Sequence, residues 1–287
     1  MHMFRLSLLL SLCIAGAAAS MSLQAAEPAQ VQIQSLHRDK AVLTGYLLRP
    51  ESDRPAPTVL LLHGCSGPIT SKGQIASRER AWMNLFASKG YAVLLLDSFN
   101  PRGFASICTN GQRPLTAETD RPYDAYGALG WLRAQPFVDG SKVAIMGWSH
   151  GAMTTLAAIS EGMIKEIGWT QPGFLTAVAF YPGCIELNKT KYVNKLPLLM
   201  QLGEKDDWTP PKNCVAMAKA AAGRGAAPIE LDVYPGAYHA FDNPTGKVNA
   251  RKANSGAGER TVHSGADPAA RAKAIPRTAD WLAKAFQ

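Results

Sequence analysis

Runs of apolar residues recur along this chain at intervals that suit strands buried inside a sheet. Largely apolar runs are typical of strands covered on both faces, and they occupy residues 58–62, 91–96, 143–146, 174–180 and 196–202. Residues 31–34 and much of 41–48 instead alternate apolar and polar side chains, which predicts strands with one exposed face. A further strand is predicted at 229–234.

Helical patterns separate these strands. Helices are predicted at 77–89, at 123–134, after residue 153, at 211–222 and within 269–286, where Pro276 must start, end or kink part of the last one. Buried strands alternating with helices predict an α/β protein with a largely parallel, doubly wound sheet. Ligands of such sheets gather at the carboxyl ends of the strands. Residues 247–265 are basic and rich in Gly, Ser and Ala, which predicts a mobile surface loop.

The turn after the strand at 143–146 has a recognisable form. Residues 147–151 read Gly-Trp-Ser-His-Gly, a G-x-S-x-G pattern that is weak alone and informative when a strand precedes it and a helix follows. Such a turn strains the backbone of the serine and directs its hydroxyl over a helix N-terminus, where negative charge is favoured. Gly147 and Gly151 suit it because side chains there would collide with the adjoining strand and helix. Ser149 is therefore the candidate nucleophile.

A serine hydroxyl is a poor nucleophile at neutral pH, so Ser149 requires a base and an acid. His239 follows the last predicted strand and is the candidate base, the alternative being a capping or core histidine. Asp206 is the candidate acid because it fits a G-x-x-D-x-x-[VT]-P spacing after a buried strand, and Asp207 remains the competing choice. The chain order Ser, Asp, His is that of α/β-hydrolases and not that of chymotrypsin or subtilisin.

An oxyanion hole needs two backbone N–H groups that are fixed before charge develops. We expect one from His150, which follows the nucleophile, and one from Cys65, in the loop after the third strand. His63 and His150 could suggest a metal site, but no carboxylate cluster accompanies them. Trp148 and Trp208 are candidate substrate-binding residues, and packing under a loop is the alternative for both.

The composition and the N-terminal residues indicate a single domain that is exported from the cytoplasm. The chain has 287 residues, 47% of them hydrophobic, which suits one α/β domain over residues 27–287. Residues 1–26 contain one arginine, then a short apolar stretch and then small residues. This pattern predicts a cleaved signal peptide, and a buried or anchoring helix is the alternative. Its removal lowers the formal net charge of +8 by one. No basic cluster or basic-aromatic stripe indicates nucleic-acid binding. We therefore expect a periplasmic or secreted protein without a stable membrane span.

Four cysteines remain after export: Cys65, Cys108, Cys184 and Cys214. An even number in an oxidising compartment predicts two disulfides with three possible connectivities, and free buried thiols are the alternative. No C-x-x-C or Cys/His spacing indicates a zinc site.

With these motifs in place, the chain resembles the dienelactone hydrolase family of α/β-hydrolases, in its exported branch with a serine nucleophile. The resemblance covers roughly residues 41–241 and rests on HGCSG, DSFNPRG, GWSHG, YPGC, GEKDDWTP and YHAF in this order. It implies the α/β-hydrolase fold and hydrolysis of a small ester or lactone, without metal or cofactor. On that fold, Cys65 and Cys108 follow neighbouring strands and Cys184 and Cys214 flank the acid loop, so these two pairings are expected.

Three positions depart from the cytoplasmic members of the family. Those enzymes use a cysteine where this chain has Ser149, and a glutamate where it has Gly64. They bind the substrate carboxylate with two arginines, of which Arg102 is a weak match for one, while Asn243 stands at the other. Dienelactone itself is therefore not the expected substrate. For Arg102, a loop arginine bonded to backbone carbonyls is an equally good interpretation.

The function expected from these observations is exported hydrolysis of carboxylic esters or lactones through an acyl-serine intermediate. Two alternatives stay open. One is a peptidase of the prolyl-oligopeptidase type, although such enzymes usually carry a large accessory domain. The other is a ligand-binding protein on an inactive hydrolase scaffold, which the presence of all three candidate residues disfavours.

Overall fold

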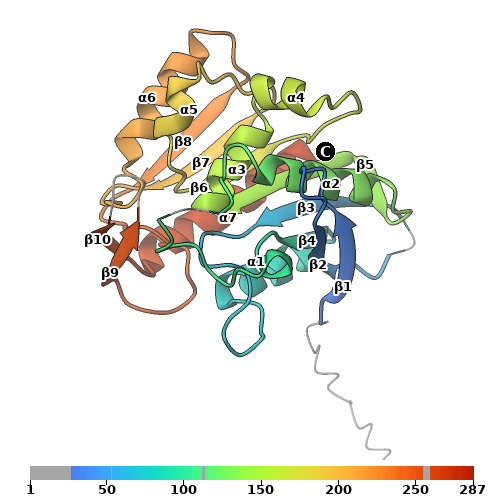
Figure 1. Cartoon of the computed structure of the whole chain (residues 1–287), viewed down its shortest axis with the longest axis horizontal. Coiled ribbons are helices and arrows are strands. Elements are labelled where there is room, and N and C mark those ends of the chain that lie inside the picture. The colour runs from blue at the N-terminus through green and yellow to red at the C-terminus, as the bar shows by residue number, and fades with distance from the viewer. Residues whose placement is uncertain (1–26, 53, 112–113, 255–258) are drawn as a thin grey trace, which may run out of the picture.

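The computed structural model describes residues 27–287 except 53, 112–113 and 255–258. The predicted signal peptide, residues 1–26, lies outside the described residues. A twisted sheet runs through the centre of the described chain, and helices cover both of its faces (Figure 1).

The central sheet has eight strands in the order β1-β2-β4-β3-β5-β6-β7-β8. Their bounds are β1 Ala29–Gln34, β2 Val42–Leu48, β3 Ala56–Leu62, β4 Ala92–Asp97, β5 Val138–Trp148, β6 Ala177–Phe180, β7 Leu198–Gly203 and β8 Ile229–Tyr234. The pairs β1–β2 and β2–β4 are antiparallel, and the other pairs are parallel. The parallel strands other than β8 correspond to the apolar runs of the sequence, as expected for strands covered on both faces, whereas β8 is the partly exposed edge strand.

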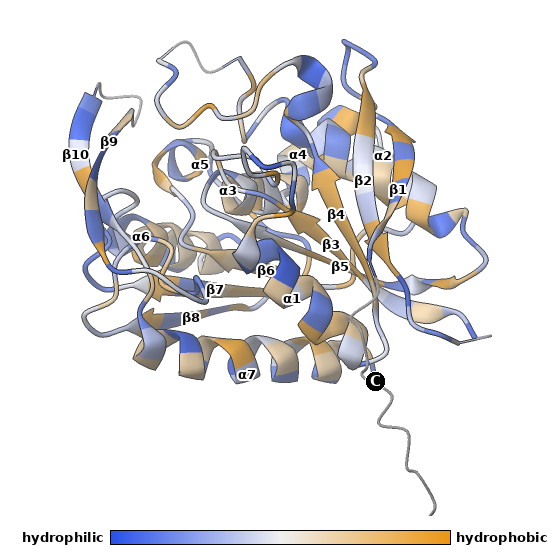
Figure 2. Cartoon of the chain, turned by 90° about the horizontal axis from the view of Figure 1, so that it is seen from below, coloured by the Kyte–Doolittle hydropathy of each residue, from blue (hydrophilic) through white to orange (hydrophobic). Residues whose placement is uncertain are grey.

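Seven α-helices and one 3₁₀ turn accompany the strands in the described chain. Their bounds are α1 Ser77–Ser88, η1 Asn100–Arg102, α2 Arg121–Arg133, α3 His150–Ala158, α4 Glu161–Ile167, α5 Ile185–Lys189, α6 Pro211–Ala222 and α7 Pro268–Ala285. Figure 2 shows α7 along one face of the sheet and α3 and α6 on the opposite face. The short helices α4 and α5 were not predicted, and α7 continues through Pro276.

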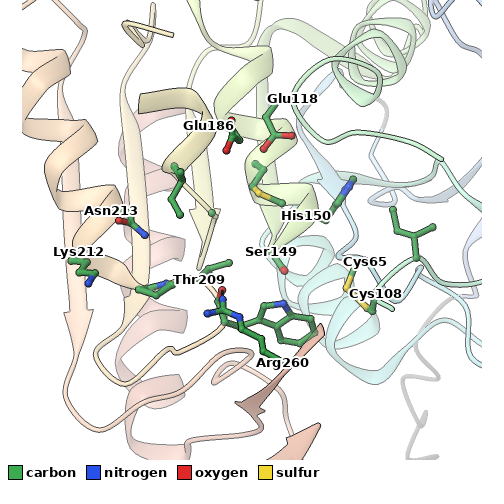
Figure 3. A pocket seen from close by; sticks show the side chains of 16 residues that line it. Cys65, Cys108, Glu118, Ser149, His150, Glu186, Thr209, Lys212, Asn213 and Arg260 are labelled. Carbon is green, nitrogen blue, oxygen red and sulfur yellow. Dashed lines mark hydrogen bonds between the residues drawn. A yellow bond between two sulfur atoms is a disulfide. The ribbon is translucent and has the colours of Figure 1, made fainter. Parts of the chain in front are cut away.

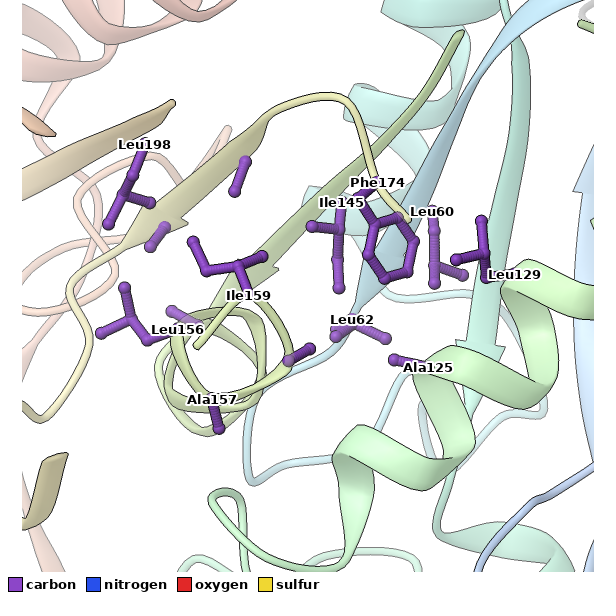
Figure 4. Packing of buried hydrophobic residues seen from close by; sticks show 14 of the residues in the cluster. Leu60, Leu62, Ala125, Leu129, Ile145, Leu156, Ala157, Ile159, Phe174 and Leu198 are labelled. Atoms are coloured by element: carbon purple, nitrogen blue, oxygen red, sulfur yellow. The ribbon is translucent and has the colours of Figure 1, made fainter. Parts of the chain in front are cut away.

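Alternate residues of the central strands feed two separate cores. Leu60 and Leu62 of β3 point to the side of α2 and α3 (Figure 4), whereas Val59 and Leu61 pack with residues of α1 and α7. Because successive side chains of a strand point to opposite faces, one apolar run can serve both cores. The strands are therefore firmly held, and their carboxyl ends provide a rigid edge for the loops that follow.

The prediction of a mobile loop at residues 247–265 was wrong. Residues Asn249–Asn254 and Glu259–Ser264 form β9 and β10, an antiparallel pair outside the central sheet. The pair appears as a largely polar ribbon in Figure 2. Of its described side chains, Ala253 and Val262 are buried. A strand that buries so little shows almost no apolar alternation, so its sequence resembles that of a polar loop.

Candidate active site

Ser149 occupies the tight turn between β5 and α3. Its backbone has φ 51° and ψ −114°, an uncommon conformation that costs on the order of 1–3 kcal/mol for a residue with a side chain. A Cβ at Gly147 would lie 2.2 Å from the carbonyl oxygen of Gly151, and one at Gly151 would lie 2.0 Å from that of Leu62. Glycine is therefore required at both positions, and the strained turn is held by the packing of β3, β5 and α3.

His239 and Asp206 meet Ser149 from two other loops at the same sheet edge. The His239 Nε2 atom lies 2.9 Å from Ser149 Oγ, and His239 Nδ1 lies 2.7 Å from Asp206 Oδ2. Both Asp206 and His239 are buried. An imidazole bonded in this way has one nitrogen ready to accept the serine proton and the other bound to a carboxylate, which favours the imidazolium form.

The acid loop presents its two aspartates to two different histidines. Asp206 accepts hydrogen bonds from the backbone N–H groups of Trp208 (2.9 Å) and Thr209 (2.8 Å) as well as binding His239. Asp207 instead binds His263 of β10, with 2.7 Å between its Oδ2 and His263 Nδ1. The structure therefore brings Asp206, and not Asp207, to the histidine that faces Ser149.

Two aromatic rings enclose the His239 imidazole. The ring centroid of Tyr181 lies 4.5 Å away and that of Trp208 lies 4.8 Å away. The Thr209 hydroxyl contacts both His239 Nδ1 (3.1 Å) and Asp206 Oδ2 (2.9 Å). Tyr181 was not predicted from the sequence. Its signals in the sequence are the YPGC motif that it begins and its place directly after β6, at the strand edge where the other candidate residues gather.

Cys65 and His150 are the two residues predicted to supply the oxyanion hole. Cys65 follows β3, and its carbonyl accepts a hydrogen bond from the N–H of Ile107 (2.9 Å). His150 is the first residue of α3. Both residues line the same cavity as Ser149. Both predicted donor residues therefore lie at the cavity into which Ser149 opens.

The side chains of His63 and His150 are hydrogen-bonded within the protein near the site. The N–H of Ser98 donates to His63 Nε2 (3.2 Å), and burial, reinforced by the charge of Arg121, holds the pKa of His63 well below its usual value. Arg121 donates to the carbonyl of His63 (3.0 Å) and lies 2.9 Å from His150 Nδ1. Burial lowers the pKa of Arg121 to about 10. This buried arginine, which the sequence does not distinguish from a surface one, braces the loop and helix that carry Cys65 and His150.

Two predicted substrate-binding residues lie away from the cavity. Arg102 donates to Asp39, Asp124 and the carbonyl of Ser98. Trp148 is fully buried beneath Ser149. Neither lines the cavity. The structure therefore favours a packing role for Trp148. Arg102 has one backbone carbonyl among its partners, as its alternative expected, but it is held mainly by the carboxylates of Asp39 and Asp124.

Two disulfides support the loops of the site. Cys65 is linked to Cys108, and Cys184 is linked to Cys214. The first disulfide lines the cavity, as Figure 3 shows, whereas both cysteines of the second are fully buried. The first therefore ties the Cys65 loop to the loop after β4, and the second ties α5 to α6.

The cavity has a volume of about 390 Å³. Figure 3 places Ser149 in the middle of its lining, with the Cys65–Cys108 disulfide on one side and Thr209 on the other. The lining further includes Trp208, Met153, Ile185, Glu118, Glu186, Lys212 and Arg260. Arg260 comes from β10 and donates to the carbonyl of Trp208. The sequence did not point to it because its segment was taken for a loop.

Among the described positions of residues 27–287, no three His, Cys, Asp or Glu side chains come together in a way that could hold a metal ion. No described helix combines the length and the apolar character needed to cross a membrane.

The sheet order, the strained turn at Ser149 and the loops at the carboxyl edge define an α/β-hydrolase. The chain belongs to the dienelactone hydrolase family, whose profile matches residues 43–286.

Solved structures share this fold. A dienelactone hydrolase-like promiscuous phosphotriesterase from metagenomic libraries superposes with a TM-score of 0.64 at 18% identity, covering 91% of this chain and 100% of that one. Esterase 2 of Thermogutta terrifontis superposes with a TM-score of 0.58 at 17% identity, covering 77% and 88% of the two chains.

The chain spans less than two thirds of the length of the curated relatives that it matches. Protein bem46 of Schizosaccharomyces pombe is 26% identical over 206 residues, which is 65% of this chain and 64% of that protein. Acylamino-acid-releasing enzyme 2 of Oryza sativa subsp. japonica is 27% identical over 168 residues, 58% of this chain but 18% of that enzyme.

Proposed function

We propose that this chain is a serine hydrolase that cleaves small carboxylic esters or lactones. The observation that carries the proposal is the hydrogen-bonded series Ser149–His239–Asp206, with 2.9 Å and 2.7 Å contacts, opening into a cavity of about 390 Å³. Family membership supports it, and so does the shared fold with a protein named as an esterase.

The geometry suits a two-step acyl transfer. His239 Nε2 accepts the Ser149 proton while Oγ bonds to the ester carbonyl carbon, and the resulting oxyanion faces the N–H groups of Cys65 and His150. Collapse of this intermediate breaks the bond to the alkoxide, which takes the proton from His239. Water then gives a proton to His239 as it attacks the acyl carbon. Collapse of this second intermediate breaks the bond to Ser149 Oγ, which takes the proton back from His239, and the acid is released. Asp206 stabilises the imidazolium in both steps.

The cavity lies near the lower end of the range of about 300–1,000 Å³ that small-molecule sites occupy. We therefore expect short acyl chains to react best. A fluorophosphonate reagent should label Ser149 because the reagent requires the same activated hydroxyl.

The test is hydrolysis of p-nitrophenyl esters from acetate to dodecanoate by the wild-type protein and Ser149→Ala. The wild type should turn over the short esters. Loss of the nucleophile should leave no more than about a 10³–10⁴-fold acceleration over water, from the oxyanion donors and binding alone. Equal rates for both proteins would rule the proposal out. Failure of the wild type to react with esters or to be labelled would favour a ligand-binding protein on this scaffold.

A peptidase is the second candidate, because the curated relatives include acylamino-acid-releasing enzymes. Release of p-nitroaniline from acylated amino-acid anilides, in the absence of ester hydrolysis, would favour it.

We also propose that the protein is exported with cleavage of the first 25 or 26 residues, with cleavage near Ala19 or Ser20 as the competing site. Two disulfides support an oxidising compartment. Amino-terminal sequencing of the protein from periplasmic and culture fractions would test this proposal.

A further inference from the structure

Asp242 is a buried carboxylate that the proposed acyl transfer does not use. It lies three residues after His239, and only 1% of its surface is exposed. Its Oδ2 accepts hydrogen bonds from Nε1 of Trp82 (2.9 Å) and Nε1 of Trp148 (2.8 Å), and its Oδ1 accepts one from the Tyr181 hydroxyl (2.5 Å). These donors come from α1, from the end of β5 and from the residue after β6. One carboxylate therefore joins three separate parts of the chain.

The direction of the Tyr181 bond follows from its neighbours. Arg78 Nη1 donates to the Tyr181 oxygen (3.1 Å), so the phenolic proton is left to bind Asp242. Burial raises the pKa of Tyr181 well above its usual value, which keeps that proton in place. Arg78 is itself paired with Glu79. The phenol is thus held from two sides, by the Arg78 guanidinium and by the Asp242 carboxylate, and these two bonds restrict its movement.

Tyr181 transmits this constraint to His239. Its ring packs against the imidazole at 4.5 Å between centroids, and the Trp208 ring lies 4.8 Å from the same imidazole. Its backbone has φ 41°, an uncommon value for an aromatic residue, and its carbonyl accepts a hydrogen bond from the Thr209 hydroxyl (3.0 Å). The Thr209 hydroxyl also contacts Asp206. Movement of Tyr181 would therefore disturb both the imidazole and the loop that carries its acid.

We propose that Asp242 is a positioning residue for the hydrolase, setting the orientation of the His239 imidazole through Tyr181 and holding the Ser149 turn through Trp148. This proposal deepens the function proposed above and rests on it for its kinetic part. Neither Asp242 nor Tyr181 lines the cavity. Both act on groups that do the chemistry, and not on the substrate.

Asp242→Asn tests the Tyr181 branch selectively. The asparagine oxygen can still accept from both indoles, but its amide group would face the phenol with donors. The phenolic proton then loses its acceptor. Tyr181→Phe removes the same bond from the other side, together with the bond from Arg78, and keeps the ring against His239, so it serves if Asp242→Asn folds poorly.

The kinetic expectation is a loss in kcat with little change in KM. Misplacement of a catalytic group by about 1 Å costs on the order of 100-fold in rate, so each variant should lower kcat for p-nitrophenyl butyrate by about 10-fold to 100-fold. KM should stay within about twofold. The double variant should lose no more than the larger single effect, because both changes break one bond.

Asp124→Asn is the matched control. Asp124 is also fully buried, and it accepts hydrogen bonds from Ser35 and Arg102, away from the cavity. Its replacement should lower the free energy of unfolding and leave kcat within about threefold. A second readout does not need activity: the low-field proton NMR signal of His239 Nδ1, in its bond to Asp206, should be sharp in the wild type and in Asp124→Asn. It should broaden in Asp242→Asn and Tyr181→Phe.

The outcomes separate this proposal from the function. If the wild type hydrolyses no ester but the NMR signal follows the expected pattern, the positioning role of Asp242 is supported and the proposed ester hydrolysis is wrong. A sharp signal in Asp242→Asn and Tyr181→Phe, or a kcat no lower than that of Asp124→Asn, would overturn the positioning role. Additive losses in the double variant would also overturn it, since the two side chains would then act independently.

Discussion

Asp206 and Asp207 are adjacent, and each binds the Nδ1 atom of a histidine at 2.7 Å, yet their surroundings differ. The side chains of the Asp206–His239 pair are 1% and 4% exposed, whereas those of the Asp207–His263 pair are 41% and 43% exposed. A charge interaction is much stronger where water is excluded than where water surrounds it. Equal distances therefore do not imply equal roles. The buried pair is the one that we propose for catalysis, and the exposed pair attaches the β9–β10 hairpin to the acid loop.

The largest expected difference between the two pairs is catalytic. Asp206→Asn should lower kcat by about 10³–10⁴-fold, the order of effect seen when the acid of a Ser-His-Asp group becomes an amide, because the amide favours the wrong imidazole tautomer. Asp207→Asn is the matched control and should stay within about twofold. The measurement is kcat on p-nitrophenyl butyrate for both variants. A larger loss in Asp207→Asn would reverse the assignment of the acid.

A smaller effect is expected from the side chain that the hairpin contributes to the cavity. Arg260→Ala removes part of the cavity wall beside Trp208, so KM for p-nitrophenyl butyrate should rise about fivefold, equivalent to about 1 kcal/mol. Lys252→Ala is the control, because Lys252 lies on the same hairpin, pairs with Glu259 and does not line the cavity. Equal KM values for the two variants would show that the hairpin does not shape the site.

The smallest effect concerns the stability that the exposed pair contributes. Partial burial acts to raise the pKa of Asp207, but hydrogen bonds from His263 outweigh it, and the net pKa is lowered. Such a group stabilises the folded state above its unfolded pKa, about 3.9 for aspartate, and loses this contribution as pH falls through the folded value. An exposed pair contributes at most about 1 kcal/mol.

Urea unfolding of the wild type and Asp207→Asn, from pH 7 down to pH 2, checks this sign. The wild type should be slightly more stable at pH 7, and the difference should shrink below about pH 4. A difference that grows as the pH falls would contradict the assigned pKa direction.

Local patterns were sufficient for the scaffold and for the candidate chemical groups. The strands β3, β4, β5 and β7 appear in the sequence as apolar runs because both faces of each strand are buried. The turn at Ser149 is visible because two backbone contacts exclude a side chain at Gly147 and Gly151, which leaves a pentapeptide signature.

Other features of the site had no local signature. The hairpin carrying Arg260 buries too little to show a period, so its strands resembled a loop. Arg102 stood in a plausible motif, but its guanidinium is occupied by Asp39 and Asp124, which are distant in sequence. The role of Asp242 could not be predicted from the sequence, because the two indoles and the phenol that surround it come from residues distant along the chain.

The sequence by itself determined the individual strands, the strained serine turn and the candidate serine, acid and histidine, because each is recognised from residues within one strand or one turn. Only the tertiary structure decided which aspartate meets His239, which side chains enclose the cavity and how Asp242 joins Trp82, Trp148 and Tyr181. Those outcomes depend on burial and on contacts between segments far apart in the chain, and the free energy of a buried polar contact is set by its surroundings.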